Sequence, residues 1–155
     1  MKRFLTRYLC LVLLWLGGAV LATAADPKIY KVLPHLLDDK GRHALSPSLY
    51  ERDAYQALLR KQPEKVQGLR FDVNWRTPSS ITGPLTLRLE LRTANRPMAS
   101  PVVLETSVKP GFFGRKWNAL TVNGDQYREM GSVLAWRATL LEGGREIAVK
   151  TSFLW

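Results

Sequence analysis

The stretch that decides the fold is Leu69-Arg70-Phe71-Asp72-Val73-Asn74-Trp75-Arg76, in which apolar and polar residues alternate strictly. Successive side chains of a β-strand point to opposite faces, so this period of two predicts a strand with one buried and one solvated face. The pattern recurs in Leu85-Thr86-Leu87-Arg88-Leu89-Glu90-Leu91-Arg92. Both stretches indicate antiparallel sheets, which commonly place one face on the core and the other in water.

Five further stretches have a strand-like composition: residues 29–37, 102–109, 117–122, 133–141 and 147–155. From these seven candidates we expect six or seven strands. Pro34 suits an edge strand, because proline cannot donate to an internal ladder. Glu142-Gly143-Gly144-Arg145 predicts a hairpin turn between the last two strands. In the final strand we expect Val149, Thr151, Phe153 and Trp155 to line the inner face.

One helix is expected, over about residues 47–61, between the first and second strands. Two starting points fit the sequence. Ser46 can be the N-cap, with Pro47 at the first helical position and Leu45 packed on Tyr50 as a hydrophobic staple. Alternatively Ser48 is the N-cap, with Glu51 three residues later in a capping box. The helical spacing collects Tyr50, Ala54, Ala57, Leu58 and Lys61 on one stripe, the side that an amphipathic helix turns toward the core.

Short antiparallel strands with turn signals about ten residues apart predict a single β-sandwich, because parallel sheets need alternating helices. Residues 29–155 resemble immunoglobulin-like and fibronectin type III-like domains, although the cysteine pair is absent and Tyr127 matches a tyrosine corner only loosely. The segment from Ser46 to Gln62 and the strand after it are also similar to small exported bacterial proteins, a likeness that implies no particular activity. We expect one sandwich domain over residues 25–155, which includes the strand and helix of residues 25–67.

The placement of the two alternating strands is open. If residues 69–75 and 85–91 pair as a hairpin, one register sets Asp72 opposite Arg88 and Arg70 opposite Glu90, and both pairs are favourable. In an immunoglobulin-like topology the two strands lie in different sheets.

Residues 1–24 are expected to be a signal peptide. A basic head with Lys2, Arg3 and Arg7 precedes an apolar block, and the segment Ala22-Thr23-Ala24 has the small-residue pattern of a cleavage site after Ala24, with Ala25 as the alternative. A retained membrane span is less consistent with the block, because a span needs about 20 apolar residues. We therefore expect a periplasmic or secreted protein without a transmembrane segment after cleavage.

Cleavage would change the charge and the cysteine content. The whole chain carries 23 Lys and Arg against 13 Asp and Glu, a net charge of +10. Loss of the three cations of the head leaves +7, and Cys10, the one cysteine, leaves with them. The expected mature chain is basic and has no disulfide, so its stability must come from burial.

Two binding regions are predicted. The first is the loop with Phe112, Phe113, Arg115, Lys116 and Trp117, which could offer rings and charge to a sugar, a lipid head group or a partner protein; alternatively, one phenylalanine closes the end of the core. The second is a basic face of arginines that could meet an anionic envelope polymer, although acidic residues are interspersed among its members, Arg70, Arg76, Arg88 and Arg92. We expect no binding of nucleic acid, because the exported chain shows no stacking platform.

A third cluster consists of His35, Asp38, Asp39 and His43, residue types that can hold zinc. Their spacing matches no known ligand motif, and a turn at residues 38–41 explains them as well. The sequence contains no P-loop, H-E-x-x-H, G-x-G-x-x-G or G-x-S-x-G motif, and no cofactor is expected. The sequence favours a non-catalytic exported β-sandwich that binds another exported protein or an envelope polymer. The alternative is a small metal-dependent or hydrolytic enzyme using this cluster.

Overall fold

The computed structural model describes residues 26–95, 100–111 and 114–155, so the expected signal peptide and the expected binding residues Phe112 and Phe113 lie outside the described residues. These residues form seven antiparallel strands, the higher of the two numbers that the sequence allowed, together with two α-helices and a short 3-10 helix. In chain order they are β1 (Lys28–Leu37), α2 (Leu49–Lys61), η1 (Pro63–Lys65), β2 (Gly68–Arg76), β3 (Leu85–Thr93), β4 (Val102–Val108), β5 (Lys116–Asn123), α3 (Gly124–Met130), β6 (Val133–Glu142) and β7 (Arg145–Thr151).

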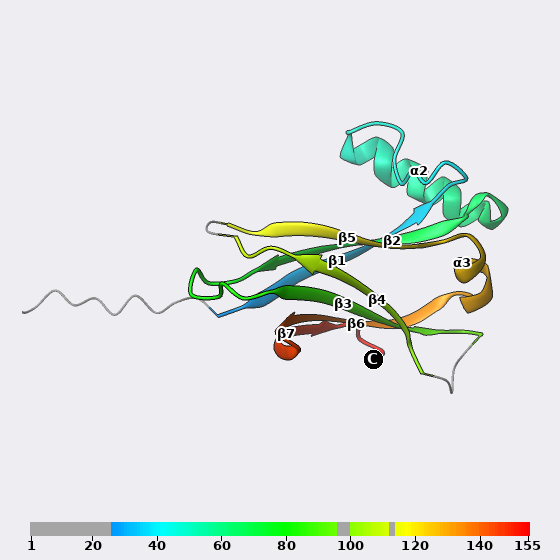
Figure 1. The fold of residues 1–155 in the computed structure, drawn as a ribbon. Coiled ribbons are helices and arrows are strands. Elements are labelled where there is room, and N and C mark those ends of the chain that lie inside the picture. Colours follow the sequence, from blue (N-terminus) through cyan, green and yellow to red (C-terminus); the bar gives the residue numbers. More distant parts are fainter. Residues whose placement is uncertain (1–25, 96–99, 112–113) are drawn as a thin grey trace, which may run out of the picture.

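The strands form two sheets, and β2 and β3 lie in different ones (Figure 1). Sheet A has the order β1-β2-β5 and sheet B the order β4-β3-β6-β7. The hairpin between β2 and β3 that would have paired Asp72 with Arg88 is therefore wrong. Arg88 instead bonds Glu105 on β4, with 2.5 Å between Nε and Oε1. Proline at position 34 does lie in an edge strand, because β1 has a partner on one side only.

The alternating apolar residues of both sheets form one core, as the period of two predicted. Its largest fully buried members include Trp75 and Phe71 of β2 and four leucines of β3, Leu85, Leu87, Leu89 and Leu91. The Trp75 indole Nε1 donates a 2.8 Å hydrogen bond to Asn118 Oδ1, so its polar group is satisfied inside the sandwich. Because successive side chains of a strand point to opposite faces, the residues between these core positions of β2 and β3 point out of the sandwich.

Helix α2 begins at Leu49, and Ser48 is its N-cap: the Ser48 hydroxyl accepts a hydrogen bond from the Glu51 amide. Ser46 contributes by accepting from the Ser48 amide and bonding the Glu51 carboxylate. The predicted staple is wrong, because Leu45 and Tyr50 are both exposed. Helix α3 is a second helix that the sequence analysis did not predict; Gly124, at a φ of 58°, begins it directly after β5.

The orientation of α2 is also opposite to the expected one. Leu59 and Gln56 are its buried residues. The predicted core-facing stripe points away from the sheets, with Tyr50 83% exposed and Leu58 41% exposed. Ala54, Ala57 and Lys61 of the same stripe are exposed as well. The five residues of the predicted stripe do lie on one side of α2, but that side faces solvent.

The end of the chain differs from the prediction because β7 stops at Thr151. Phe153 is fully exposed and Leu154 largely so. Trp155 is half-buried, and the Arg92 guanidinium lies 4.5 Å from its ring centroid. Val149 and Thr151 are exposed too, so the expected inner face of residues 149–155 is wrong.

We predict a large contrast between two truncations of apolar side chains. Leu89→Ala should lower the free energy of unfolding by about 2–5 kcal/mol, because it opens a cavity in the core. Phe153→Ala should change it by no more than about 0.5 kcal/mol, because the side chain contacts water. Urea unfolding followed by circular dichroism measures both. A loss for Phe153→Ala comparable to that for Leu89→Ala would contradict the placement of the chain end.

Candidate functional site

The predicted basic face is divided between the two sides of the sandwich. Arg70 and Arg76 alternate with the core residues of β2, whereas Arg88 and Arg92 alternate with those of β3. Because β2 and β3 belong to opposite sheets, these pairs point in opposite directions. On sheet B, Arg88 is paired with Glu105 and Arg92 covers the Trp155 ring. The four arginines therefore do not form one surface.

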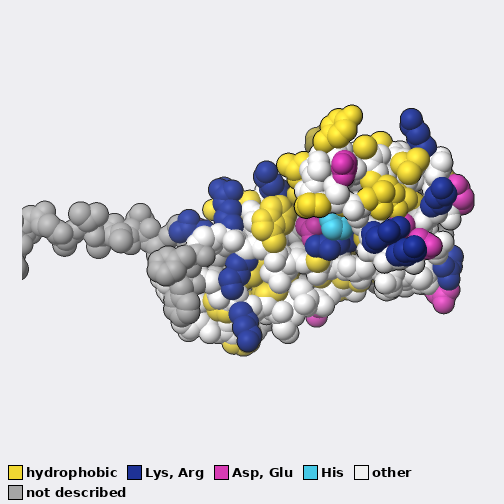
Figure 2. Space-filling view, turned by 90° about the horizontal axis from the view of Figure 1, so that it is seen from above, with side chains coloured by type: hydrophobic (Ala, Val, Ile, Leu, Met, Phe, Trp, Pro, Cys, Tyr) yellow, Lys and Arg dark blue, Asp and Glu magenta, His cyan; other side chains and the backbone are white. Residues whose placement is uncertain are grey.

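A different cationic surface lies on the outer side of sheet A, at the end remote from α2. We call it the cationic face and define it by six residues: Lys28, Tyr30, Lys31, Arg76, Arg115 and Trp117. In register, Lys28 lies opposite Arg76, and Lys31 and Trp117 lie opposite Asn74 from the two neighbouring strands. Figure 2 shows basic side chains spread over this half of the molecule.

A bulge in β1 places an aromatic ring among the cations. The register between β1 and β2 shifts between Ile29 and Lys31, so Tyr30 is the extra residue. The Arg115 guanidinium carbon lies 3.9 Å from the Tyr30 ring centroid, and Lys28 Nζ lies 5.6 Å from it. These cation–π contacts hold Arg115, which precedes β5, close to the first strand.

Trp117 supplies a second ring on the cationic face, and 52% of its surface is exposed. Asn74 lies beneath this part of the face, is buried, and donates from Nδ2 to the Lys116 carbonyl at 3.2 Å. Lys116 itself points elsewhere. Its ammonium group donates to the carbonyls of Lys109 and Pro110, so this predicted binding residue fastens the loop between β4 and β5.

The charge of the cationic face is uncompensated. No ion pair involves Lys28, Lys31, Arg76 or Arg115 in the part of the chain that the structure describes. Asp72 is the one carboxylate within strands β1, β2 and β5. It already contacts Arg70, with 2.8 Å between Oδ1 and Nε, and His35, with 3.5 Å between Oδ2 and Nε2. The face can therefore attract an anion from outside the chain.

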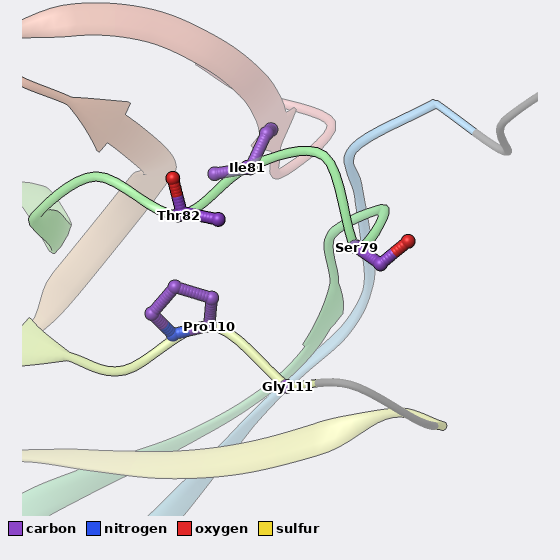
Figure 3. A pocket seen from close by; sticks show the side chains of 5 residues that line it. All are labelled: Ser79, Ile81, Thr82, Pro110 and Gly111. Atoms are coloured by element: carbon purple, nitrogen blue, oxygen red, sulfur yellow. The ribbon is translucent and has the colours of Figure 1, made fainter.

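A small cavity of about 170 Å³ lies at the same end of the sandwich. Figure 3 shows Pro110 facing Ile81 and Thr82 across it, so the loops before β3 and before β5 form its walls. Ser79 and Gly111 complete the lining. None of these five described lining residues has a titratable side chain.

The predicted metal cluster is only partly brought together. The His35 and His43 rings lie 5.2 Å apart between centroids, but Asp38 is fully engaged elsewhere. Its carboxylate accepts hydrogen bonds from the Lys40 and Arg42 amides, the Arg42 guanidinium and the Tyr55 hydroxyl. Burial alone would raise the pKa of Asp38, but these bonds lower it to about 2. Asp39 is exposed, and no group of three metal-ligating side chains occurs among the described residues.

The two histidines lie beside α2, where His35 is buried and His43 is half-buried. Burial lowers the pKa of His35 below its usual value; Asp72 opposes this shift, whereas His43, Arg52 and Arg70 add to it. Burial also lowers the pKa of His43, with Arg70 and Arg52 adding and Asp72 opposing. The folded chain therefore disfavours protonated imidazole at this position.

Gln56 fixes the position of α2 against sheet A. Its Oε1 accepts from the Leu36 amide at 2.8 Å, and its Nε2 donates to the carbonyls of Leu36 and His43, each at 2.9 Å. Leu36 lies in the edge strand β1, so the carboxamide takes the place of a neighbouring strand at this point. Tyr55, bonded to Asp38, adds a second anchor one residue away.

The sequence analysis proposed Arg76, Arg115 and Trp117 for two separate regions, and the structure brings these three together. It did not identify Lys28, Tyr30 or Lys31. The sequence pattern gave little indication that these three residues share a face, because the bulge breaks the period of two in the first strand. The roles of Gln56 and Tyr55 also have no local signature, since their partners are 13 to 20 residues away.

Comparison with known proteins found no matching family model, no matching curated protein and no matching solved structure. The helices of the described residues include none with the length and apolarity needed to cross a membrane.

We predict that Gln56→Ala destabilises the chain by about 1–3 kcal/mol, because it leaves the partly buried amide and carbonyl of Leu36 without their side-chain partner. The free energy of unfolding in urea measures the effect. Gln126→Ala, the same change at an exposed position of α3, is the control and should have little effect. Equal losses in the two variants would show that Gln56 does not anchor α2.

We also predict that stability falls on acidification through the range below about pH 6.5. In that range the unfolded chain binds protons at His35 and His43 more readily than the folded chain, whose imidazole pKa values are lowered. Stability is therefore present at higher pH and is lost as the pH falls. His35→Gln/His43→Gln should flatten the dependence of the melting temperature on pH; an unchanged slope would contradict it.

Proposed function

We propose that this chain is a non-catalytic binding module, exported through residues 1–24, that holds an anionic polymer of the cell envelope on its cationic face. The observation that carries the proposal is the uncompensated charge of Lys28, Lys31, Arg76 and Arg115 on one outer surface. Four cations close together without acidic partners raise the local potential and attract carboxylate or phosphate groups.

The aromatic rings favour a glycan as the polymer. Tyr30 is covered by Arg115, whereas Trp117 presents an exposed ring beside Lys31. An indole face can pack against the apolar side of a sugar ring while neighbouring cations pair with its acidic substituents. Carboxylated and phosphorylated glycans share this chemistry, and the experiment below distinguishes them.

The hydrogen bonds of the polar side chains next to α2 support a binding role over catalysis. Asp38, the most perturbed carboxylate, has its oxygens occupied by hydrogen bonds that fasten the chain before α2. The Ser46 and Ser48 hydroxyls serve the start of the same helix. These groups have structural partners and are not aimed at a shared reacting position.

We also infer that the sandwich is of the immunoglobulin-like kind, with one strand relocated. In constant-type immunoglobulin domains the first, second, fifth and fourth strands form one sheet, and the third, sixth and seventh form the other. The groups β1-β2-β5 and β3-β6-β7 agree with this order, whereas β4 pairs with β3 at the edge of sheet B. Loops at the end of such sandwiches commonly carry binding residues, which is consistent with the position of Arg115.

We predict that Lys31→Glu/Arg76→Glu weakens the binding of polygalacturonate, a carboxylated glycan, by about tenfold or more, which corresponds to about 1.4 kcal/mol. Titration calorimetry at low ionic strength measures the affinity, which should also fall as salt is added. Arg145→Glu/Lys150→Glu makes the same change of charge on β7 and is the matched control. Equal weakening in both double variants would contradict the assignment of the cationic face.

Three further probes identify the kind of polymer. Trp117→Ala should weaken binding of polygalacturonate more than binding of inorganic polyphosphate, which has no ring for the indole. Uncharged dextran should not bind. Tighter binding of a single-stranded oligonucleotide than of either anionic polymer would contradict the proposal of a glycan.

A further inference from the structure

The outward stripe of α2 is an apolar helix face without a partner in the described chain. At 100° per residue, Tyr50, Ala54, Ala57, Leu58 and Lys61 fall within a band about 100° wide. All five are exposed, and Leu49 and Leu45 beside them are exposed as well. Figure 2 shows apolar side chains gathered over α2. Exposed apolar patches of this kind commonly mark interaction surfaces.

The helix cannot hide this stripe by turning over. The Gln56 carboxamide is bonded to Leu36 and His43, and the Tyr55 hydroxyl to Asp38, all on the opposite side of the helix. Leu59 is almost completely buried on that side. Turning the stripe inward would break four hydrogen bonds and expose Leu59, so the chain holds its apolar stripe outward.

We propose that the stripe binds the same stripe of a second copy of this chain, with the two α2 helices antiparallel about a two-fold axis. The positions of the stripe are symmetric along the helix. Ala54 and Ala57 lie on either side of its midpoint, and Tyr50 and Lys61 lie equally far from that midpoint. An antiparallel pair therefore brings Ala54 against the partner's Ala57, and Tyr50 against the partner's Lys61.

The size of the side chains suits this contact. Two alanines at the centre let the helix backbones approach closely, which the packing of one helix on another requires. At the ends, each Tyr50 ring can receive the ammonium group or the methylene stem of the partner's Lys61. An isologous contact of this kind closes after two copies and does not propagate.

The charges beside the stripe are complementary for the antiparallel direction. Asp53 and Arg60 lie on the same flank of the stripe, seven residues apart, and both are exposed. In a two-fold pair that flank meets its own copy with the chain direction reversed. With Ala54 against the partner's Ala57, the partner's Arg60 lies about two residues, or roughly 3 Å, along the axis from Asp53, which is within reach of these side chains, and the contact occurs twice. Asp53 also contacts Arg52 of its own chain, at 2.8 Å, and remains largely exposed in that contact.

Sedimentation velocity over a range of concentrations tests the proposal on the purified chain. We expect a reversible dimer, because one helix face is small compared with a standard interface of about 800 Å² per partner. Ala57→Glu should raise the dissociation constant by about tenfold or more, since it places two carboxylates beside the axis. Ala94→Glu, the same change at an exposed alanine directly after β3, should leave dimerisation unchanged.

A charge exchange tests the direction of the pair. Asp53→Arg alone and Arg60→Asp alone should each weaken the dimer, and the combined variant should restore it. Circular dichroism confirms that each variant is folded. The proposal is overturned by a chain that stays monomeric at the highest soluble concentration, by a dimer that Ala57→Glu does not weaken, or by a combined variant that is no better than the single ones. None of these results tests the assignment of the cationic face, which has its own variants at the opposite end of sheet A.

Discussion

Sheets A and B each bury one face against the other, and this constraint decides where the remaining side chains of the strands can lie. Trp75 and Phe71 are held in the core by the same alternation that forces Arg76 and Arg70 outward. Because the two sheets face each other, outward residues of β2 and β3 point to opposite sides. The cationic face exists because β1, β2 and Arg115, the residue before β5, all present cations on the outer side of one sheet.

The edge of sheet A imposes a second constraint, and α2 meets it. Leu36 of β1 directs its amide and carbonyl away from β2, where no further strand follows, and both groups need partners. The Gln56 carboxamide supplies both a donor and an acceptor. This requirement orients the helix more strongly than its apolar stripe does. A buried glutamine therefore explains why Tyr50 and Leu58 remain in solvent.

The two proposed surfaces lie on the same side of the molecule but differ in chemistry. The cationic face attracts through charge and is weakened by salt, whereas the stripe of α2 binds by burying apolar surface. A two-fold pair through α2 would join two cationic faces in one particle. Two linked sites on one extended polymer bind more tightly than either site alone, provided that the polymer can reach both.

The amino-acid sequence by itself determined much of the local structure, although it left two candidate N-caps for α2 and did not indicate α3. Alternation predicted the strands and Gly143-Gly144 predicted the final hairpin, because each of these depends on residues close together in the chain. It could not decide the pairing of strands, since Arg88 fits Asp72 and Glu105 equally well by charge.

Only the tertiary structure decided what each face of a strand or helix contacts. It separated Arg88 and Arg92 from Arg76, joined Arg76 to Lys31 and Trp117, and turned the apolar stripe of α2 outward. These outcomes depend on contacts between distant segments, such as that of Gln56 with Leu36, and on a bulge at Tyr30 that interrupts the local pattern. Local spacing shows which residues share a face, but only the packing of distant segments decides what that face meets.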